Sequence, residues 1–466
     1  MSNEPLLALD ITENMMYSHN SSLEGGGGIE QKQMGLLAGL TQSDEPMERK
    51  ESVDRLSVAS IYSASHVHPQ NSPYLTTFLL INTMIGSGIL NQPYVFSQAG
   101  ILGGIIGFII ASTSTWLGLV LMTAAGVHAN VLEYGGLAKF AFGKFGENLI
   151  DYCIVINAFG SQLGYILIVG DTLSELLRSW GCSTEGCGYI STTIWAVGIF
   201  VTPICLFRHF GHLAYLSIFS ILTIVLVLCL VIIGGPLEYE PGSGVVKILD
   251  IGGAIRSTGS IVFAVTCASA NFQGYITTDE KYRNFNSWSK ITGAAVGIGS
   301  SMCMFMGIAG YLSFRDNTDG EILNNFNGHG FDFFKVMVVC HLILYIPVNF
   351  VIMRYSVVKL STNTRSELLP IGKHTVLSVV LLFFTVGTEL LLRACGFASG
   401  TAFTLILNIT GGVGGSLSAI ILPAAMYVKI MPKDAAYRNV AIGLVIFGIV
   451  VMIAVLVEVI INLNNN

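Results

Sequence analysis

The residues best suited to binding a small polar molecule are Gly86-Ser87-Gly88, which interrupt a long apolar stretch. Two glycines and a serine in three positions weaken an α-helix, because each glycine costs about 1 kcal/mol relative to alanine. If the helix unwinds here, the amides after the break point outward at a helix N-terminus and favour a carboxylate. The alternative is a notch of small residues that lets two helices pack closely. Spacing alone does not separate these two interpretations.

A second apolar stretch is interrupted in a similar way. Ile261–Thr266 is followed by the small and polar residues Cys267–Asn271. Interrupted segments at corresponding positions of two halves of a chain indicate a binding site between inverted repeats. This pairing favours a transport site over a packing notch.

Membrane-spanning helices are needed to position these residues. Of 466 residues, 52% are hydrophobic and 11% are charged, whereas soluble domains carry about 25% charged residues. Because a span needs about 20 largely apolar residues, the sequence predicts an all-α polytopic membrane protein with eleven transmembrane helices. These are expected near residues 75–97, 101–125, 148–177, 190–207, 212–234, 251–275, 290–313, 333–357, 374–392, 400–428 and 438–462.

Polar side chains inside other spans extend this site or join helices to one another. Tyr165 follows Gln162 by three residues, so both lie on one helix face. Tyr345 lies in a polar stripe at a spacing of four, and interhelical hydrogen bonding explains such a stripe equally well. Glu389 lies one turn before Arg393, which suggests an ion pair at the membrane edge or, alternatively, a proton site.

Several functional classes are disfavoured. A net charge of −6 argues against a nucleic-acid partner. The chain has no Cys-x-x-Cys pair, no His-Glu-x-x-His motif and no phosphate-binding loop. We therefore expect no enzyme activity, no cofactor and no metal site beyond a coupling ion. Cys182 and Cys187 stand apart in a polar loop, where a disulfide is compatible with an oxidising compartment.

The polar residues also predict how the chain is divided and oriented. Residues 1–72 are rich in Gly, Ser, Glu and Gln and predict a disordered tail. The transmembrane domain is expected over 73–463. Lys and Arg are more frequent in the connections on the side of the tail, which places the N-terminus in the cytosol. Eleven spans then place the C-terminus on the extracytosolic side, the side of Cys182 and Cys187.

Residues 82–100, from Asn82 to Gly100, resemble the first span of the amino acid/auxin permease superfamily. The resemblance is strongest to its sodium-coupled neutral amino acid transporters and their vacuolar relatives. Further matches are 310–314, 319–325 and 421–429, and the resemblance covers about 75–462.

This resemblance implies a LeuT-like fold, with two inverted five-helix repeats over about 75–234 and 251–428 and an accessory helix over 438–462. It implies transport of amino acids, most often neutral ones, by alternating access, driven by sodium ions or protons. The membrane would be the plasma membrane or that of a vacuole or lysosome. A membrane sensor of the same fold, signalling through the tail, is the alternative. The oligomeric state is left open.

The resemblance also assigns roles to individual residues. The amides of Gly86, Ser87 and Gly88 would hold the substrate carboxylate. Carbonyl groups near Cys267, Ala268, Ser269 and Ala270 would accept the amino group. Phe263 and Tyr165 would shape the pocket for the side chain.

A coupling ion would bind at Asn82, Ile85 and Tyr345. Sodium-coupled members have a Thr at the position of Tyr345, and a His often occupies the position of Ala268. A Tyr hydroxyl lies several ångströms farther from the backbone than a Thr hydroxyl. Both departures favour proton coupling or uniport over sodium coupling.

Overall fold

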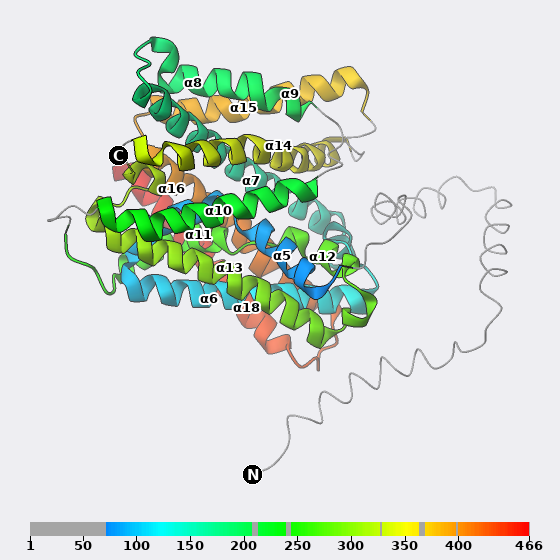
Figure 1. Ribbon diagram of the computed structural model, residues 1–466. Helices are drawn as coiled ribbons and strands as arrows, with labels where there is room; N and C mark the ends of the chain where they lie inside the picture. The colour runs from blue at the N-terminus through cyan, green and yellow to red at the C-terminus, as the bar shows by residue number, and fades with distance from the viewer. Residues whose placement is uncertain are drawn as a thin grey trace. The chain divides into compact units, whose positions relative to one another are not determined.

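A computed structural model describes residues 71–206, 213–238, 244–326, 329–362, 369–397 and 399–465. The predicted tail lies almost entirely outside the described residues. Its last two residues are already part of the fold. Asn71 forms an isolated parallel bridge with Thr278, and the Ser72 side chain caps the first described helix. Apart from this bridge, the described secondary structure is helical (Figure 1).

The helices form interrupted rods that run roughly parallel or antiparallel to one another (Figure 1). In the described part of the chain, four segments with tighter or wider turns separate parts of them: η1 (Ser87–Asn91), η3 (Val197–Val201), η5 (Ala268–Ala270) and η11 (Thr410–Ile421). The α-helices are α5 (Pro73–Met84), α6 (Gln92–Ala129), α7 (Tyr134–Ser179), α8 (Tyr189–Ala196), α9 (Thr202–Cys205), α10 (Leu213–Gly234), α11 (Ile251–Ala264), α12 (Asn271–Thr277), α13 (Phe285–Phe314), α14 (Asp332–Thr362), α15 (Ile371–Ala394), α16 (Ser399–Ile409), α17 (Leu422–Ile430) and α18 (Arg438–Asn465).

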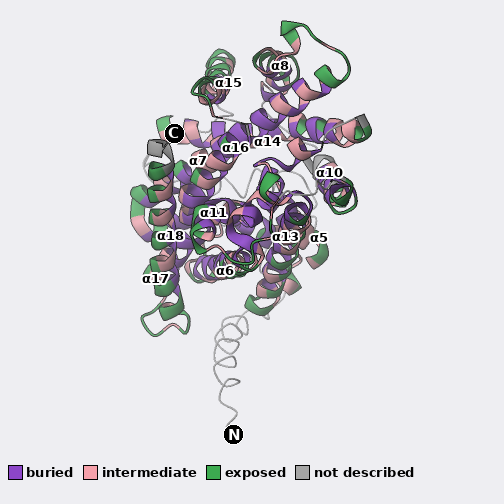
Figure 2. Ribbon diagram, turned by 90° about the vertical axis from the view of Figure 1, so that its left-hand side faces the viewer, coloured by how far each residue is buried: buried purple, intermediate pink, exposed green. Residues whose placement is uncertain are grey.

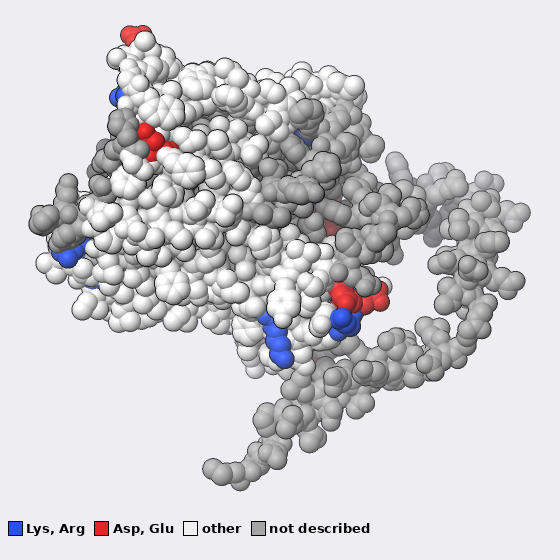
Figure 3. All heavy atoms as spheres, in the orientation of Figure 1, with Lys and Arg blue, Asp and Glu red and all other residues white. Residues whose placement is uncertain are grey.

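Eight helical segments among the described residues are long and apolar enough to cross a membrane. A shorter apolar helix covers Tyr189–Cys205. Large apolar side chains face outward on the peripheral helices, for example Phe383 on α15 and Ile446 on α18. On the face in Figure 3, charged side chains gather near the ends of the helices and other residues cover the belt between them. This surface suits a hydrocarbon environment, as the sequence predicts.

Two glycines interrupt the longest helices. Gly100 in α6 and Gly143 in α7 have φ values of 76° and 67°, which side chains rarely adopt. At Gly100 a Cβ atom would also lie 2.7 Å from the carbonyl of Ile248. The chain before α11 runs past this kink, where the Leu102 amide donates to Ile248 at 2.8 Å. The part of α6 before Gly100 therefore continues the interrupted helix that begins with α5.

The core lies where these rods meet (Figure 2). Helix α7 packs on α14, α6 packs on α13 and α11, and α11 also packs on η11. In Figure 2, α8, α10, α15 and α18 lie at the periphery and expose one face. A disulfide joins Cys182 and Cys187 in the connection between α7 and α8. Inside the bundle, η1 contacts α6, α11 and α13, and η5 contacts α6, α12 and η11.

Candidate functional site

The first interruption separates α5 from η1. The backbone of Ile85 is extended, with φ −82° and ψ 94°, and Gly86 follows with φ −121° and ψ −149°. Among the described residues, the amides of Ser87 and Gly88 donate no backbone hydrogen bond. They are the first two residues of η1, which leads into α6, so they form the N-terminal end of a helix, where partial positive charge gathers. This end favours a carboxylate.

Glycine is needed in this interruption because aromatic side chains approach it closely. A Cβ atom at Gly86 would lie 2.8 Å from the hydroxyl oxygen of Tyr165. A Cβ atom at Gly88 would lie 2.8 Å from Cδ1 of Phe263 and 3.4 Å from Cα of Ala264. The Tyr165 hydroxyl is also within hydrogen-bonding reach of both the backbone amide and the side chain of Ser87. The structure therefore brings Gly86, Gly88, Tyr165 and Phe263 together with the end of α11.

The second interruption separates α11 from α12. The amides of Val265 and Thr266 donate to Val262 and Phe263, each at 3.3 Å, and close the end of α11. Among the described residues, the carbonyls of Ala264, Val265 and Thr266 accept no backbone hydrogen bond. A helix C-terminus with free carbonyls carries partial negative charge. This end favours an ammonium group.

The free carbonyls differ from those expected near Cys267–Ala270. The Cys267 carbonyl accepts from the Ala270 amide at 3.1 Å, and the Ala268 carbonyl accepts from the Asn271 amide. The turn of η5 therefore uses these two carbonyls, and the available ones lie on residues 264–266. The side chains of Cys267 and Ala268 are buried, and Ser269 is exposed.

Tyr345 connects α14 to the first interruption. Its ring lies 5.9 Å from the ring of Tyr165, and its hydroxyl donates to the carbonyl of Asn82 at 3.4 Å. Ile85 and Asn82 are buried. The structure therefore brings Asn82 and Tyr345 together through the backbone carbonyl of Asn82.

Three further residues at the site escaped the sequence analysis. Gln92 donates from Nε2 to the carbonyl of Gly88 at 2.6 Å, which holds the orientation of that peptide. Thr266 follows the end of α11, and Phe403 on α16 lies 3.1 Å from where a Cβ of Gly164 would be. The spacing of four between Gly88 and Gln92 was a usable signal. Phe403 had none, because it is one aromatic residue in an apolar run.

Comparison with known proteins decides the family. Residues 70–461 match the family model described as transmembrane amino acid transporter protein. The chain belongs to this family. The resemblance inferred from residues 82–100 is thereby confirmed, and the family is one of transporters rather than enzymes.

Named relatives in this amino acid transporter family are distant in sequence. Vacuolar amino acid transporter 2 of Saccharomyces cerevisiae is 26% identical over 382 residues, which cover 77% of each chain. The putative sodium-coupled neutral amino acid transporter 11 of Mus musculus is 25% identical over 426 residues, covering 88% of this chain and 90% of the relative. Vacuolar amino acid transporter 5 of Schizosaccharomyces pombe is 26% identical over 405 residues, covering 80% and 91%.

A crystal structure of a manganese transporter from Eremococcus coleocola has a similar fold. The TM-score is 0.53 at 10% sequence identity, and the match covers 85% of this chain and 86% of the other. This likeness concerns the fold alone, so it adds nothing about the substrate of this family member.

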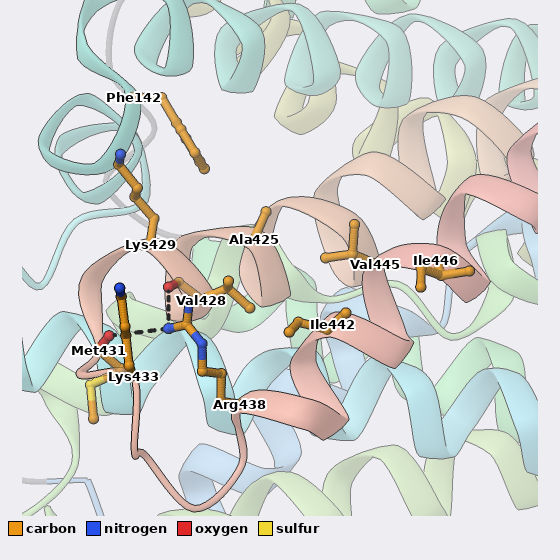
Figure 4. Close-up of a pocket in the computed structure, with 10 residues that line it drawn as sticks. All are labelled: Phe142, Ala425, Val428, Lys429, Met431, Lys433, Arg438, Ile442, Val445 and Ile446. Carbon is orange, nitrogen blue, oxygen red and sulfur yellow. Dashed lines mark hydrogen bonds between the residues drawn. The ribbon is translucent and has the colours of Figure 1, made fainter.

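A pocket at the turn between α17 and α18 is distinct from both interruptions (Figure 4). Lys429, Lys433 and Arg438 line it together with apolar residues of α18 such as Ile442. Arg438 donates to the carbonyl of Val428 at 2.8 Å and so closes the end of α17. The guanidinium group is thus already used to satisfy the backbone of this turn.

Proposed function

We propose that this protein is a secondary transporter that moves neutral amino acids across a membrane by alternating access. The observation that carries this proposal is the meeting of two helix ends of opposite polarity. The amides of Ser87 and Gly88, which donate to no backbone carbonyl in the described part of the chain, face the region where Ala264–Thr266 present free carbonyls. An α-amino acid carries its carboxylate and its ammonium group on one carbon atom, so it needs both kinds of partner close together.

The side chains that contact the interruptions favour a neutral substrate. Tyr165, Phe263 and Phe403 are aromatic, and Thr266 is polar but uncharged. A charged substrate side chain would be costly to bury among them, because a buried charge needs a partner. The Tyr165 hydroxyl, beside Gly86 and Ser87, is placed to donate to the substrate carboxylate once a substrate is bound.

The proposal includes eleven spans arranged as two inverted repeats and one accessory helix. The kink at Gly100 divides α6, so that α5, η1 and residues 92–99 form one interrupted span and residues 101–129 form the next. The interruption in α11–α12 then begins a second set of five. The likeness to the manganese transporter supports such an arrangement at the level of the fold.

The proposed orientation has a cytosolic N-terminus and an extracytosolic C-terminus. The disulfide between Cys182 and Cys187 then lies on the oxidising side, as its chemistry requires. A vacuolar, lysosomal or plasma membrane is compatible with this arrangement. The two yeast relatives are named vacuolar transporters. For this protein we therefore include the membranes of acidic compartments among the expected locations.

Exposure differs between the two sides of the interruptions, which supports alternating access. Residues 87–91 on the outer side are all buried. There Asn91 donates to the carbonyl of Gly320 at 2.7 Å and to the hydroxyl of Thr404 at 2.8 Å. On the cytosolic side, the polar residues Thr83, Ser269 and Gln273 are exposed. We infer that this arrangement is closed outside and open to the cytosol.

Flux measurement in proteoliposomes tests the proposed function. Purified full-length protein should move a labelled neutral amino acid across the membrane with saturable kinetics. Saturable binding without movement would refute the transporter and favour the sensor of the same fold. A panel of small neutral amino acids, with a charged amino acid as the matched comparison, would test the substrate class.

The coupling ion requires a separate measurement. The Tyr345 hydroxyl donates to the Asn82 carbonyl and so uses a group of the proposed ion site, which favours proton coupling or uniport. Uptake should therefore persist when choline replaces sodium at two values of pH. Loss of uptake without sodium at both values would refute this preference.

A further inference from the structure

Three carboxyl groups, two of them fully buried, lie together at the outer end of the bundle, away from the proposed substrate site. They belong to Asp171 on α7, Glu389 on α15 and Glu321 in the connection between α13 and α14. The side chains of Glu321 and Glu389 have no exposed surface. In the described part of the chain, one oxygen of each of the three carboxyl groups has no hydrogen-bond partner.

Hydrogen bonds and ion pairs connect these groups into one network. Arg393 pairs with Asp171 at 2.7 Å and lies over the ring of Tyr189 at 4.0 Å. The Tyr189 hydroxyl donates to Glu389. Thr172, next to Asp171, donates to Glu321 at 3.4 Å. Four elements therefore meet at the network: α7, α8, α15 and the connection that carries Glu321.

No cation among the described residues forms an ion pair with Glu321, although the charge of Lys335 acts on it from a distance and lowers its pKa slightly against the larger effect of burial. Arg393 is paired with Asp171, and the buried Lys335 on α14 is paired with Glu175 at 2.6 Å. The other charged neighbours of Glu321 are acidic, namely Asp171 on α7 and Asp319 in its own connection. An ionised carboxylate that is fully buried without a paired cation is strongly disfavoured. A neutral, protonated Glu321 avoids this cost.

Glu321 is directly connected to the closed outer side of the first interruption. Its amide donates to Oδ1 of Asp319 at 2.9 Å, and Asn324 donates to the same oxygen at 3.1 Å. The neighbouring Gly320 accepts from Asn91, and its backbone touches that of Gly400 on α16. The turn containing Glu321 thus covers the start of α6 and α16. Moving Glu321 toward water requires this turn to leave them.

We propose that Glu321 binds a proton when the outer turn is closed, and that loss of this proton opens the turn over the first helix interruption. The inference deepens the proposed transport function by assigning a proton-binding residue to its outer gate. The ligand is a proton rather than a divalent cation, because the described residues contain no group of three or more His, Cys, Asp or Glu side chains placed to hold a metal ion.

The electrostatics of Glu321 agree with this assignment. Burial raises the pKa of its carboxyl group well above the ordinary range, and the charge of Asp171 raises it further. A carboxyl group whose pKa is raised in the closed state stabilises that state at low pH. This stabilisation is lost as pH rises toward the raised pKa. Opening should therefore become about tenfold more favourable per pH unit between the ordinary and the raised pKa, as expected for one proton.

Hydrogen–deuterium exchange of the full-length protein in lipid nanodiscs tests the inference without any transport. Rates for peptides covering 318–326 would be corrected for the intrinsic pH dependence of amide exchange. In the wild-type protein, the corrected rates should rise about tenfold per pH unit. In Glu321→Gln, which imitates the protonated carboxyl group, they should stay low at every pH. Equal pH dependence in both proteins would overturn the proposal.

A matched control is Asp316→Asn, because Asp316 is about half exposed beside Lys247 at the outer end of α13. This variant should keep the wild-type pH dependence. If Asp316→Asn also abolishes it, general charge loss rather than Glu321 is responsible, and the proposal fails. Proteoliposome flux tests the transport function separately from the proton site. A protein with the expected exchange behaviour but no flux would refute the transport function and leave the proton site intact.

Discussion

The helices α5–η1 and α11–α12 are both interrupted inside the bundle, but the interruptions have different causes. The first contains Gly86 and Gly88, and its own residues make the helix weak. The second, over residues 265–270, contains no glycine. There the space is provided by glycines of a neighbouring element. A Cβ atom at Gly411 in η11 would lie 2.5 Å from the amide nitrogen of Phe263, and one at Gly415 would lie 3.0 Å from Oγ1 of Thr266.

The first interruption thus has a cause in its own residues, and the second has a cause in its tertiary contacts. Substitutions within the first interruption should mainly affect substrate binding, because the backbone amides there have to be approached closely. At the second, we propose that backbone carbonyls bind the substrate, so the side chains of 265–270 should matter less. Its geometry should instead be sensitive to the glycines of η11. Four substitutions test this distinction, from the largest expected effect on uptake to the smallest.

Gly86→Val should abolish measurable uptake while the protein stays folded in the membrane. The new side chain would occupy the space between the amides and the Tyr165 hydroxyl, 2.8 Å from the Cβ position. Losing two hydrogen bonds to a charged carboxylate costs about 3–6 kcal/mol, or at least about a hundredfold in affinity. Uptake in proteoliposomes measures this. Gly387→Val is the control, since nothing lies within 4 Å of a Cβ atom at Gly387. Normal uptake by Gly86→Val would refute the site.

Gly411→Ala should lower the stability of the protein and, through it, the uptake. Its Cβ atom would lie 2.0 Å from the carbonyl oxygen of Gly259, and backbone atoms cannot move aside easily. Overpacking of this kind costs about 1–3 kcal/mol. Thermal unfolding in detergent, compared with Gly387→Ala, measures the loss. An unchanged unfolding temperature would mean that η11 does not shape the second interruption.

Tyr165→Phe should raise the apparent KM for a neutral amino acid about tenfold with little change in stability. The ring contact with Tyr345 at 5.9 Å remains, and only the hydroxyl beside Gly86 is lost. One hydrogen bond to a charged group contributes about 1.5 kcal/mol, which corresponds to the tenfold change. Concentration dependence of the initial uptake rate measures it. An unchanged KM would show that the hydroxyl does not contact the substrate.

Cys267→Ala should change the apparent KM by less than about threefold, because the interruption contributes backbone carbonyls and the change amounts to no more than about 0.6 kcal/mol. The substitution removes the buried thiol group at a modest cost in packing. The same uptake assay measures it beside Tyr165→Phe. A complete loss of uptake would instead assign a direct role to the thiol and remove the contrast between the two interruptions.

Composition and local motifs predicted much of this protein. Long apolar runs with few charges require a helical membrane protein, and the family follows from residues around the first interruption. That interruption could be located because its cause is local. The approximate positions of the helices were predictable for the same reason, since a helix satisfies its backbone hydrogen bonds within its own segment.

Tertiary structure decided what the sequence left open. The free carbonyls of the second interruption belong to Ala264–Thr266, whereas the sequence predicted carbonyls near Cys267–Ala270. Contacts with η11 and the hydrogen bonds of the η5 turn determine which carbonyls accept a backbone hydrogen bond. It also brought Glu321, Asp171 and Glu389 together from segments far apart in the chain. Whether a carboxyl group has a cation beside it depends on packing between helices, and no spacing within one helix records it.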